Sequence, residues 1–231
     1  TDPTALKHKG LTYFYVDMKT PGIEAKPIKQ ISGSANFNEV FFNDVRIPDS
    51  QRIGAEGDGW KVSLTTLMNE RLAVGDPPGL DFDQIFEASK EIEVEDGLAV
   101  KNSEVRQKMA DWYIQSRGLQ YTKYRSMTAL SKGQTPGPEL SISKLVTASK
   151  MQDVSSYALD LMDMSGMVHQ DQNPILKNLF QNGYFFSAAM RIAGGTDEVL
   201  RNIIAERVLG LPQDERSDKK LPFNELPSGK N

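Results

Sequence analysis

The sequence predicts a mainly α-helical protein, an up-and-down helical bundle preceded by part of an antiparallel β-domain. Three observations lead to this prediction. Residues 11–47 are strand-like, the glycine-rich stretch at 54–59 (GAEGDG) interrupts that pattern, and the apolar residues beyond it recur at helical spacing. Because the long helical segments are joined by short turns, we expect neighbouring helices to pack antiparallel.

The strand-like segments lie in the N-terminal quarter of the chain. Residues 11–18 (LTYFYVDM) are rich in aromatic and β-branched side chains, and two further strands are expected at 23–28 and 37–47, with Asp44 at a bend. Three strands with open edges make a poor domain on their own. Residues 1–56 are therefore predicted to be a partial β-domain, the remnant of a larger one.

The helical segments follow, and residues 57–212 are predicted to form the bundle domain. Helices are expected over 60–74, 81–92, 104–132, 139–164, 175–193 and 197–209, with a loop at 93–102 and turns at 134–138 and 170–174. Buried positions in the long helix at 104–132 are expected at Met109, Trp112, Tyr113, Leu119 and Tyr124. The charged tail at 213–231 has few apolar anchors and is expected to fray.

Composition excludes several classes of protein. A net charge of −4 gives no electrostatic reason to expect a nucleic acid or an acidic membrane as partner. The chain has no cysteine, and its two histidines, His8 and His169, are far apart, so no metal centre is expected. No apolar run reaches the ~20 residues of a membrane span. The first residues do not resemble a signal peptide either.

The stretch RIAGGTDEVLRNIIAERVLGLP at 191–212 connects a glycine turn to a helix. Gly194 and Gly195 let the backbone approach a partner closely, and Thr196 is the expected N-cap, with Asp197 and Glu198 in the first turn. Val199, Leu200, Ile203, Ile204, Val208 and Leu209 are predicted to form one apolar face. Gly210 and Pro212 end the helix. From these residues alone, a well-capped loop-to-helix junction is an equally good interpretation.

Glu70 is the candidate general base. It follows Leu67 by three residues and precedes Val74 by four, so it shares a helical stripe with apolar side chains. A carboxylate beside apolar groups is partly desolvated, and its pKa rises toward the range that suits proton abstraction. Most helical glutamates are instead solvated, and spacing alone leaves that interpretation open.

The motif at 194–212 resembles the C-terminal signature of the flavin-dependent acyl-CoA dehydrogenases, and residues 10–212 read in register with the later half of that family. The N-terminal helical domain and the first part of the middle β-domain have no counterpart, so the resemblance identifies the chain as a fragment. Most members carry the catalytic glutamate where this chain has Gly194. A minority, including the isovaleryl and long-chain enzymes, supply it from the helix that opens the C-terminal domain, before an arginine. Met68–Leu72 (MNERL) matches that arrangement.

The resemblance implies α,β-dehydrogenation of an acyl-CoA thioester. Glu70 would take the α-proton while a hydride leaves the β-carbon for N5 of FAD. Arg71, Gly194 and Gly195 are the implied substrate contacts, with the glycine backbone hydrogen-bonded to the thioester carbonyl. Thr196, Asp197 and Glu198 are the implied cofactor contacts, although Thr196 is equally well explained as a cap.

Two stretches depart from the family pattern. The Arg-x-x-Phe-Gly sequence that reaches a neighbouring subunit's FAD is not found between Lys90 and Arg106, and Arg106 is at best a weak substitute. Where many members have Gln-x-x-Gly-Gly, residues 160–164 read DLMDM. Both departures concern the adenine half of the cofactor site.

A second interpretation is a non-catalytic subunit or oligomerisation module of a related complex. The family implies electron-transfer flavoprotein as electron acceptor and a homo- or hetero-oligomer, commonly a homotetramer. It also implies a location in the bacterial cytoplasm or the mitochondrial matrix. Bound FAD would separate the catalytic from the non-catalytic interpretation.

Overall fold

The computed structural model describes residues 1–73, 80–134, 140–168, 175–215 and 217–226, without the side chains of 68–73, 140, 175–177, 217 and 219. The chain divides into two compact units. Unit 1 comprises Thr1–Gly75 and Asp214–Asn231, and unit 2 comprises Asp76–Gln213. The predicted domain boundaries stay predictions. The predicted fold class is confirmed, because helices dominate and the strands are few, short and antiparallel.

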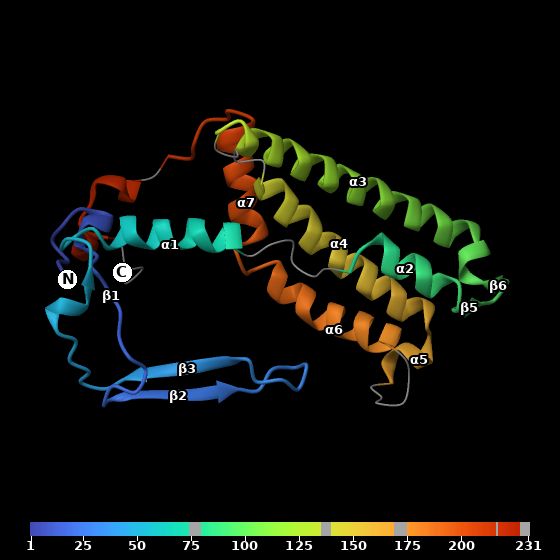
Figure 1. Cartoon of the computed structure of the whole chain (residues 1–231), viewed down its shortest axis with the longest axis horizontal. Helices are drawn as coiled ribbons and strands as arrows, with labels where there is room; N and C mark the ends of the chain where they lie inside the picture. The colour runs from blue at the N-terminus through green and yellow to red at the C-terminus, as the bar shows by residue number, and fades with distance from the viewer. Residues whose placement is uncertain (74–79, 135–139, 169–174, 216, 227–231) are drawn as a thin grey trace. The chain divides into compact units, whose positions relative to one another are not determined.

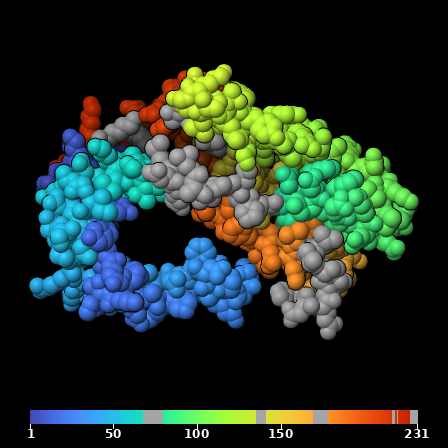
Figure 2. Space-filling model, in the orientation of Figure 1, coloured from blue at the N-terminus to red at the C-terminus, as the bar shows by residue number. Residues whose placement is uncertain are grey.

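Unit 1 contains two small antiparallel sheets and one long helix. Strand β1 (Tyr13–Phe14) pairs with β4 (Arg52–Ile53), and β2 (Ile23–Ile28) pairs with β3 (Phe37–Phe42). Asp44 follows β3 with a φ of +50°, which confirms the predicted bend. Nearly all β2–β3 side chains are exposed, and Figure 2 shows this hairpin in blue. A hairpin with both faces exposed fits the prediction of a partial β-domain.

Helix α1 (Gly59–Ala73) follows β4 and matches the helix predicted at 60–74. The N–H of Gly59 donates to the carbonyl oxygen of Leu11 at 2.8 Å, which anchors the start of the helix to the preceding chain. The ring of Trp60 stacks on His8, with centroids 4.1 Å apart and planes 8° from parallel. His8, from the short 3₁₀ helix Lys7–Gly10, therefore helps to hold the N-terminal segment against α1.

The C-terminal segment also packs within unit 1. It contains the 3₁₀ helices Ser217–Lys220 and Phe223–Glu225, and Pro222 forms a β-bridge with Leu6. The ammonium of Lys7 lies 2.9 Å from Asp218 Oδ2. The expectation that the tail frays is wrong for these residues, because backbone and ionic contacts supply the anchoring that apolar side chains do not.

Unit 2 is the helical bundle. Its helices are α2 (Phe82–Ser89), α3 (Ser103–Ser131), α4 (Leu140–Leu161), α5 (Met164–Met167), α6 (Ile175–Met190) and α7 (Asp197–Ile203). Figure 1 shows α4 running between α3 and α6. Ile85, Trp112, Val154 and Phe180 are fully buried where α2, α3, α4 and α6 meet. Apolar burial at these positions is the main force that holds the bundle together.

A buried lysine connects three helices of unit 2. Lys150 on α4 is 3% exposed, and its ammonium donates to Asp81 Oδ1 at 2.7 Å and to Ser116 Oγ at 2.8 Å. Asp81 is the N-cap of α2 and forms a capping box with Gln84. Burial raises the pKa of Asp81, but the hydrogen bonds from Lys150, Ser116 and the Phe82 N–H outweigh it and hold that pKa below its usual value.

Three sequence predictions about unit 2 are wrong in detail. Tyr113 and Tyr124 are 41% and 51% exposed, because their positions on α3 lie away from the α3–α4 contact that buries Trp112. Residues 93–102 contain a small hairpin, β5 (Glu93–Val94) with β6 (Gly97–Leu98), because Asp96-Gly97 is a tight-turn sequence and Gly97 has a φ of +112°. Residues 135–138 of the turn predicted at 134–138, and the whole turn predicted at 170–174, lie outside the described residues.

The third difference concerns the last helix. Leu200 is 2% exposed, but Val199 and Leu209 are 49% and 66% exposed, so the predicted apolar face does not dock as a whole. Residues Ile204–Val208 wind as a π-helix, which shifts later side chains off the 3.6-residue period. Gly210, with a φ of +69°, follows the helix as predicted. None of the helices in the described parts of the chain is long and apolar enough to span a membrane.

Candidate functional site

The glycine turn between α6 and α7 is the centre of the candidate site. Gly194 and Gly195 both have left-handed backbone angles, with φ of +67° and +104°, which side chains other than glycine rarely adopt. Thr196 caps α7, and its hydroxyl oxygen accepts the N–H of Val199 at 3.2 Å. The predicted cap is therefore confirmed. The N–H of Asp197 donates to the carbonyl oxygen of Arg191 at 3.2 Å and closes the turn.

Backbone donors remain available in this turn. Among the described residues, the N–H groups of Gly194 and Gly195 find no hydrogen-bond acceptor. Gly194 is exposed, and a Cβ placed on it would meet no atom within 4 Å. The turn therefore offers two backbone donors, with open space beside Gly194, an arrangement that suits a carbonyl or other acceptor oxygen of a ligand.

Three charged side chains surround the turn on its protein side. Asp197 is 3% exposed, and its Oδ2 accepts the Nε–H of Arg191 at 2.6 Å. Lys144 on α4 places its ammonium 3.8 Å from Asp197 Oδ1 and donates to the carbonyl oxygen of Gly195 at 2.6 Å. Arg191 also donates from Nη1 to Gln152 Oε1 at 2.7 Å. The carboxylate of Asp197 is thus paired inside the protein.

The predicted cofactor contacts occupy different environments. Thr196 is half-buried, Asp197 is buried and Glu198 is exposed. Hydrogen bonds from the Glu198 N–H and from the Thr196 hydroxyl lower the pKa of Glu198. Asp197 faces Arg191 and Lys144, so the backbone of the turn is better placed for a ligand than this carboxylate. The roles of all three residues stay predictions.

Sequence reasoning missed Lys144 and Arg191. Arg191 immediately precedes the turn, but an arginine at the end of a helix is commonly a surface charge. Lys144 lies 51 residues before Gly195 in sequence, on another helix, so no local pattern relates the two. Only the packing of α4 against α6 and α7 brings the lysine to the turn.

Glu70 and Arg71 lie next to each other on α1, as the sequence predicts, in the last turn of that helix. Their side chains lie outside the described part of the structure. They belong to unit 1, whereas the glycine turn belongs to unit 2. Their convergence on one substrate stays a prediction.

A cavity of about 500 Å³ lies beside the stretch that departs from the family pattern. Asp160 and Asp163 contribute carboxylates to its lining, and Asp163 has a left-handed φ of +50° just after α4 ends. Gln181 on α6 is 8% exposed and donates its amide to the carbonyl oxygens of Gly166 and Val168 at 2.8 and 3.1 Å. The negative charges of Asp160 and Asp163 do not favour a phosphate group in this cavity.

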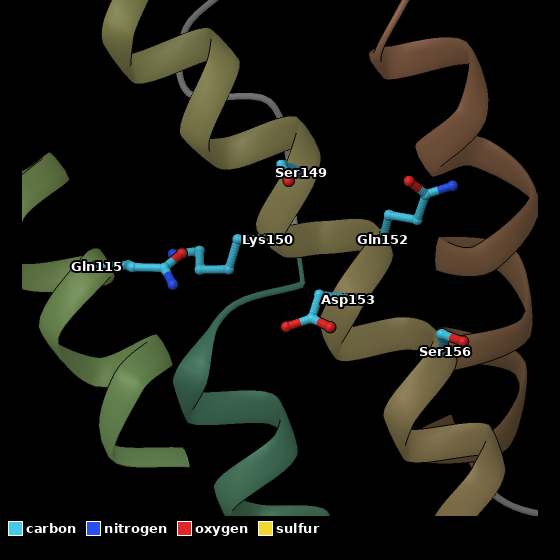
Figure 3. A pocket seen from close by; sticks show the side chains of 6 residues that line it. All are labelled: Gln115, Ser149, Lys150, Gln152, Asp153 and Ser156. Carbon is cyan, nitrogen blue, oxygen red and sulfur yellow. The ribbon is translucent and has the colours of Figure 1, made fainter. Parts of the chain in front are cut away.

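A polar groove of about 390 Å³ runs between α3 and α4, and Figure 3 shows its lining. Three of its lining residues, Lys150, Gln152 and Asp153, already have partners in the protein. Lys150 binds Asp81 and Ser116, Gln152 accepts from Arg191, and Asp153 accepts the Trp112 indole N–H at 2.8 Å and pairs with Lys108 at 3.0 Å. The groove is therefore explained by interactions that hold helices together.

The chain folds into a helical bundle with a glycine turn before its last helix, and comparison with known sequences identifies the family. The sequence model described as "Acyl-CoA dehydrogenase, C-terminal domain" matches residues 57–209. The chain belongs to the acyl-CoA dehydrogenase family.

Two curated relatives from Mycobacterium tuberculosis illustrate the similarity. The chain is 34% identical to acyl-CoA dehydrogenase FadE34 over 215 residues, which cover 92% of this chain and 28% of the relative. It is also 34% identical to acyl-CoA dehydrogenase IpdE1 over 217 residues, which cover 94% of this chain and 54% of the relative. The chain thus spans about half the length of the second relative and less of the first.

Solved structures share the fold. The ChsE4-ChsE5 complex from Mycobacterium tuberculosis aligns with a TM-score of 0.72 at 19% identity, over 90% of this chain and 55% of the solved one. The Tcur3481-Tcur3483 steroid ACAD aligns with a TM-score of 0.76 at 20% identity, over 93% and 55%. Butyryl-CoA dehydrogenase from Megasphaera elsdenii gives a TM-score of 0.67 at 21% identity, over 87% and 52%.

Proposed function

We propose that the protein containing this chain catalyses α,β-dehydrogenation of an acyl-CoA thioester, with Glu70 as general base. The observation that carries the proposal combines two positions of the chain, 194 and 70–71, in a member of a dehydrogenase family. Glycine stands at 194, where most members have their base, and a Glu-Arg pair stands on α1, where a minority of members have theirs.

In this proposal one residue, Glu70, removes a proton, and the backbone of Gly194 and Gly195 stabilises the negative charge that develops. Glu70 accepts the α-proton, and the thioester oxygen gains negative charge as that proton leaves. The free N–H groups of Gly194 and Gly195 stabilise this charge, because backbone donors held in place need no reorganisation during the reaction. Arg71 contributes to holding the substrate next to Glu70.

The residues at the turn fit a hydrogen-bonding cofactor such as FAD. Thr196 is half-buried and Glu198 is exposed, so a ligand can reach both, whereas Asp197 is buried beside Arg191 and Lys144. When bound, FAD supplies the acceptor for the hydride. We assign Thr196 and the adjacent backbone to the cofactor contact, with Glu198 at its exposed edge and Asp197 acting from the interior.

The test is Glu70→Gln in the protein that contains this chain. An amide keeps the shape of the side chain but cannot accept the proton. We expect flavin absorption to be retained and acyl-CoA-dependent bleaching of the flavin to slow by about a hundred- to ten-thousand-fold. Glu91→Gln, which removes an exposed carboxylate from unit 2, is the matched control and should bleach at the normal rate. Bleaching of Glu70→Gln within a few-fold of wild type would exclude Glu70 as the base.

A specific observation favours a second candidate, a non-catalytic subunit. Asp160 and Asp163 line the cavity beside the 160–164 departure, where their charge would oppose a phosphate-bearing cofactor. If this candidate is right, the purified protein will carry no flavin absorption even after incubation with excess FAD and removal of the unbound cofactor. Stoichiometric FAD that bleaches with acyl-CoA excludes it.

The remaining proposals concern partners and location. We propose acyl-CoA as substrate, electron-transfer flavoprotein as electron acceptor and a homo- or hetero-oligomeric assembly. Among the solved structures that share the fold, one is named as an electron transferring flavoprotein of Acidaminococcus fermentans, and three are named for pairs of chains. The curated bacterial relatives support a cytoplasmic location.

A further inference from the structure

The carbonyl oxygen of Gly195 has an unusual partner for a loop carbonyl, the ammonium of a lysine from another helix. Lys144 Nζ donates to this oxygen at 2.6 Å, and the lysine side chain is only 18% exposed. A charged donor forms a stronger hydrogen bond than a neutral one. The bond fixes the peptide that joins Gly195 to Thr196, which follows the two residues with left-handed backbone angles.

The surrounding charges show that this ammonium is not simply neutralising a carboxylate. Asp197 Oδ1 lies 3.8 Å away, and Arg191 already holds the other oxygen of that carboxylate at 2.6 Å. Burial lowers the pKa of Lys144, and Arg191 lowers it further, while Asp197 and Glu198 raise it. A second cation beside Asp197 is therefore costly, and its closest contact is the turn carbonyl.

We propose that Lys144 is a positioning residue, whose ammonium holds the Gly194–Gly195 turn in the one conformation that presents its free N–H groups to the substrate. The inference rests on the proposed function for the role of those N–H groups, but the holding of the turn does not depend on it. Glycine pairs are the most flexible backbone available, so the turn needs an external restraint to be preorganised. Lys144 supplies that restraint from α4, and the Asp197–Arg191 pair supplies it from the start of α7 and the end of α6.

The first measurement is hydrogen exchange in the protein that contains this chain, and it does not depend on catalysis. The Asp197 N–H closes the turn on the Arg191 carbonyl and reports its opening. In Lys144→Met we expect this amide to exchange at least about tenfold faster, because a charge-assisted hydrogen bond is lost. Lys144→Arg, which keeps charge and donors, should restore most of the protection. Lys101→Met, which removes an exposed lysine of the same unit, should not change the exchange.

The second measurement is steady-state kinetics in the protein that contains this chain. A loosened turn loses charge stabilisation that is needed mainly in the transition state. We therefore expect kcat of Lys144→Met to fall about ten- to a hundredfold while KM stays within a few-fold. Should Lys144→Met not fold, Lys144→Gln takes its place with the same expectations, and circular dichroism establishes which variant is used.

The two measurements separate the inference from the proposed function. Unchanged exchange at Asp197 in a folded Lys144→Met variant overturns the inference, whatever the rate does. Faster exchange with unchanged kcat supports the holding of the turn but contradicts the catalytic role proposed for its N–H groups. Faster exchange together with reduced kcat supports both.

Discussion

Asp197 shows how a single residue can carry a different role from the one its position in a motif implies. It follows the glycine turn and begins α7, where an acidic side chain favours the helix dipole. Its side chain is nevertheless turned inward, to Arg191 and Lys144, and it connects α4, α6 and α7. The position of Asp197 in the motif implies a ligand contact, but its carboxylate is engaged by two cations inside the protein.

The location of the base can be tested by moving it. Glu70→Gly alone should be nearly inactive, and adding Gly194→Glu should restore part of the activity if the two positions face the same α-carbon. Rescue should be incomplete, because a misplacement of about 1 Å can cost on the order of a hundredfold. The structure supplies a second reason, since Gly194 has a φ of +67°, and a side chain at that angle costs about 1–2 kcal/mol.

Activity and melting temperature must be measured together in these variants. A side chain at position 194 would not clash with neighbouring atoms, because none lies within 4 Å of its Cβ position. A double variant that folds, binds FAD and acyl-CoA, and is no faster than Glu70→Gly would contradict the convergence of the two sites. Gly194→Glu in the wild-type background is the control for the effect of strain alone.

At the scale of the helices, two glycines have opposite surroundings. Gly183 on α6 lies where the helix packs against α4, and a Cβ there would contact Leu80 and lie 2.5 Å from Ser155 Oγ. Both neighbours are buried, and the Ser155 hydroxyl donates to the Met151 carbonyl at 2.6 Å. Gly118 on α3 is exposed, and its Cβ position meets nothing within 4 Å.

The pair predicts opposite changes in stability from the same substitution. Gly118→Ala should raise the free energy of unfolding by about 0.5–1 kcal/mol, because it reduces the backbone freedom of the unfolded chain without a clash. Gly183→Ala should lower it by about 1–3 kcal/mol, because the buried neighbours must shift. Urea unfolding of both variants beside wild type measures the difference. Equal effects would mean that α4 and α6 do not approach each other as closely as described.

At the scale of the whole molecule, the two ends of the chain meet inside unit 1. Leu6 bridges to Pro222, Lys7 pairs with Asp218, and the N–H of Asn224 donates to the Pro3 carbonyl at 3.2 Å. These contacts are ionic and backbone in kind. Residues 218–224 therefore contact the N-terminal segment at three points.

Removal of residues 214–231 tests this closure. Amide exchange in residues 1–12 should become about fivefold faster, since a surface ion pair contributes up to about 1 kcal/mol. Exchange in α3, α4 and α6 should stay the same, because those helices belong to unit 2. Mass spectrometry of peptides from the full and truncated chains gives both results. No change in residues 1–12 would contradict a structural role for the tail.

Most helices could be predicted from the sequence because their signals are local. The boundaries of α1 and α3 agree with prediction to within a residue, and Thr196 caps α7 as expected. The burial of individual side chains is harder to predict, since Tyr113 and Tyr124 are as aromatic as Trp112 but only Trp112 faces α4. Which face of a helix is buried depends on its neighbour, and that information is not local.

The candidate site also has one part that local sequence predicts and one part that depends on the packing of distant helices. Gly194, Gly195 and Thr196 are contiguous, and their backbone geometry follows from residue type. The lysine that holds them comes from a different helix, and a lysine in a helix is ordinarily a surface residue. The partnership of Lys144 with Gly195 could be found only once the bundle had brought them together.

The contacts among Lys144, Asp197 and Arg191 leave residue 194 free to vary in evolution. These three residues contact the turn at the Gly195 carbonyl and at Asp197, and none of these contacts involves residue 194. A substitution at 194 is limited by its own backbone angle and not by neighbouring atoms. An ancestral protein could therefore gain or lose a side chain at 194 while the turn kept its shape, and a base could migrate to another helix without the fold being rebuilt.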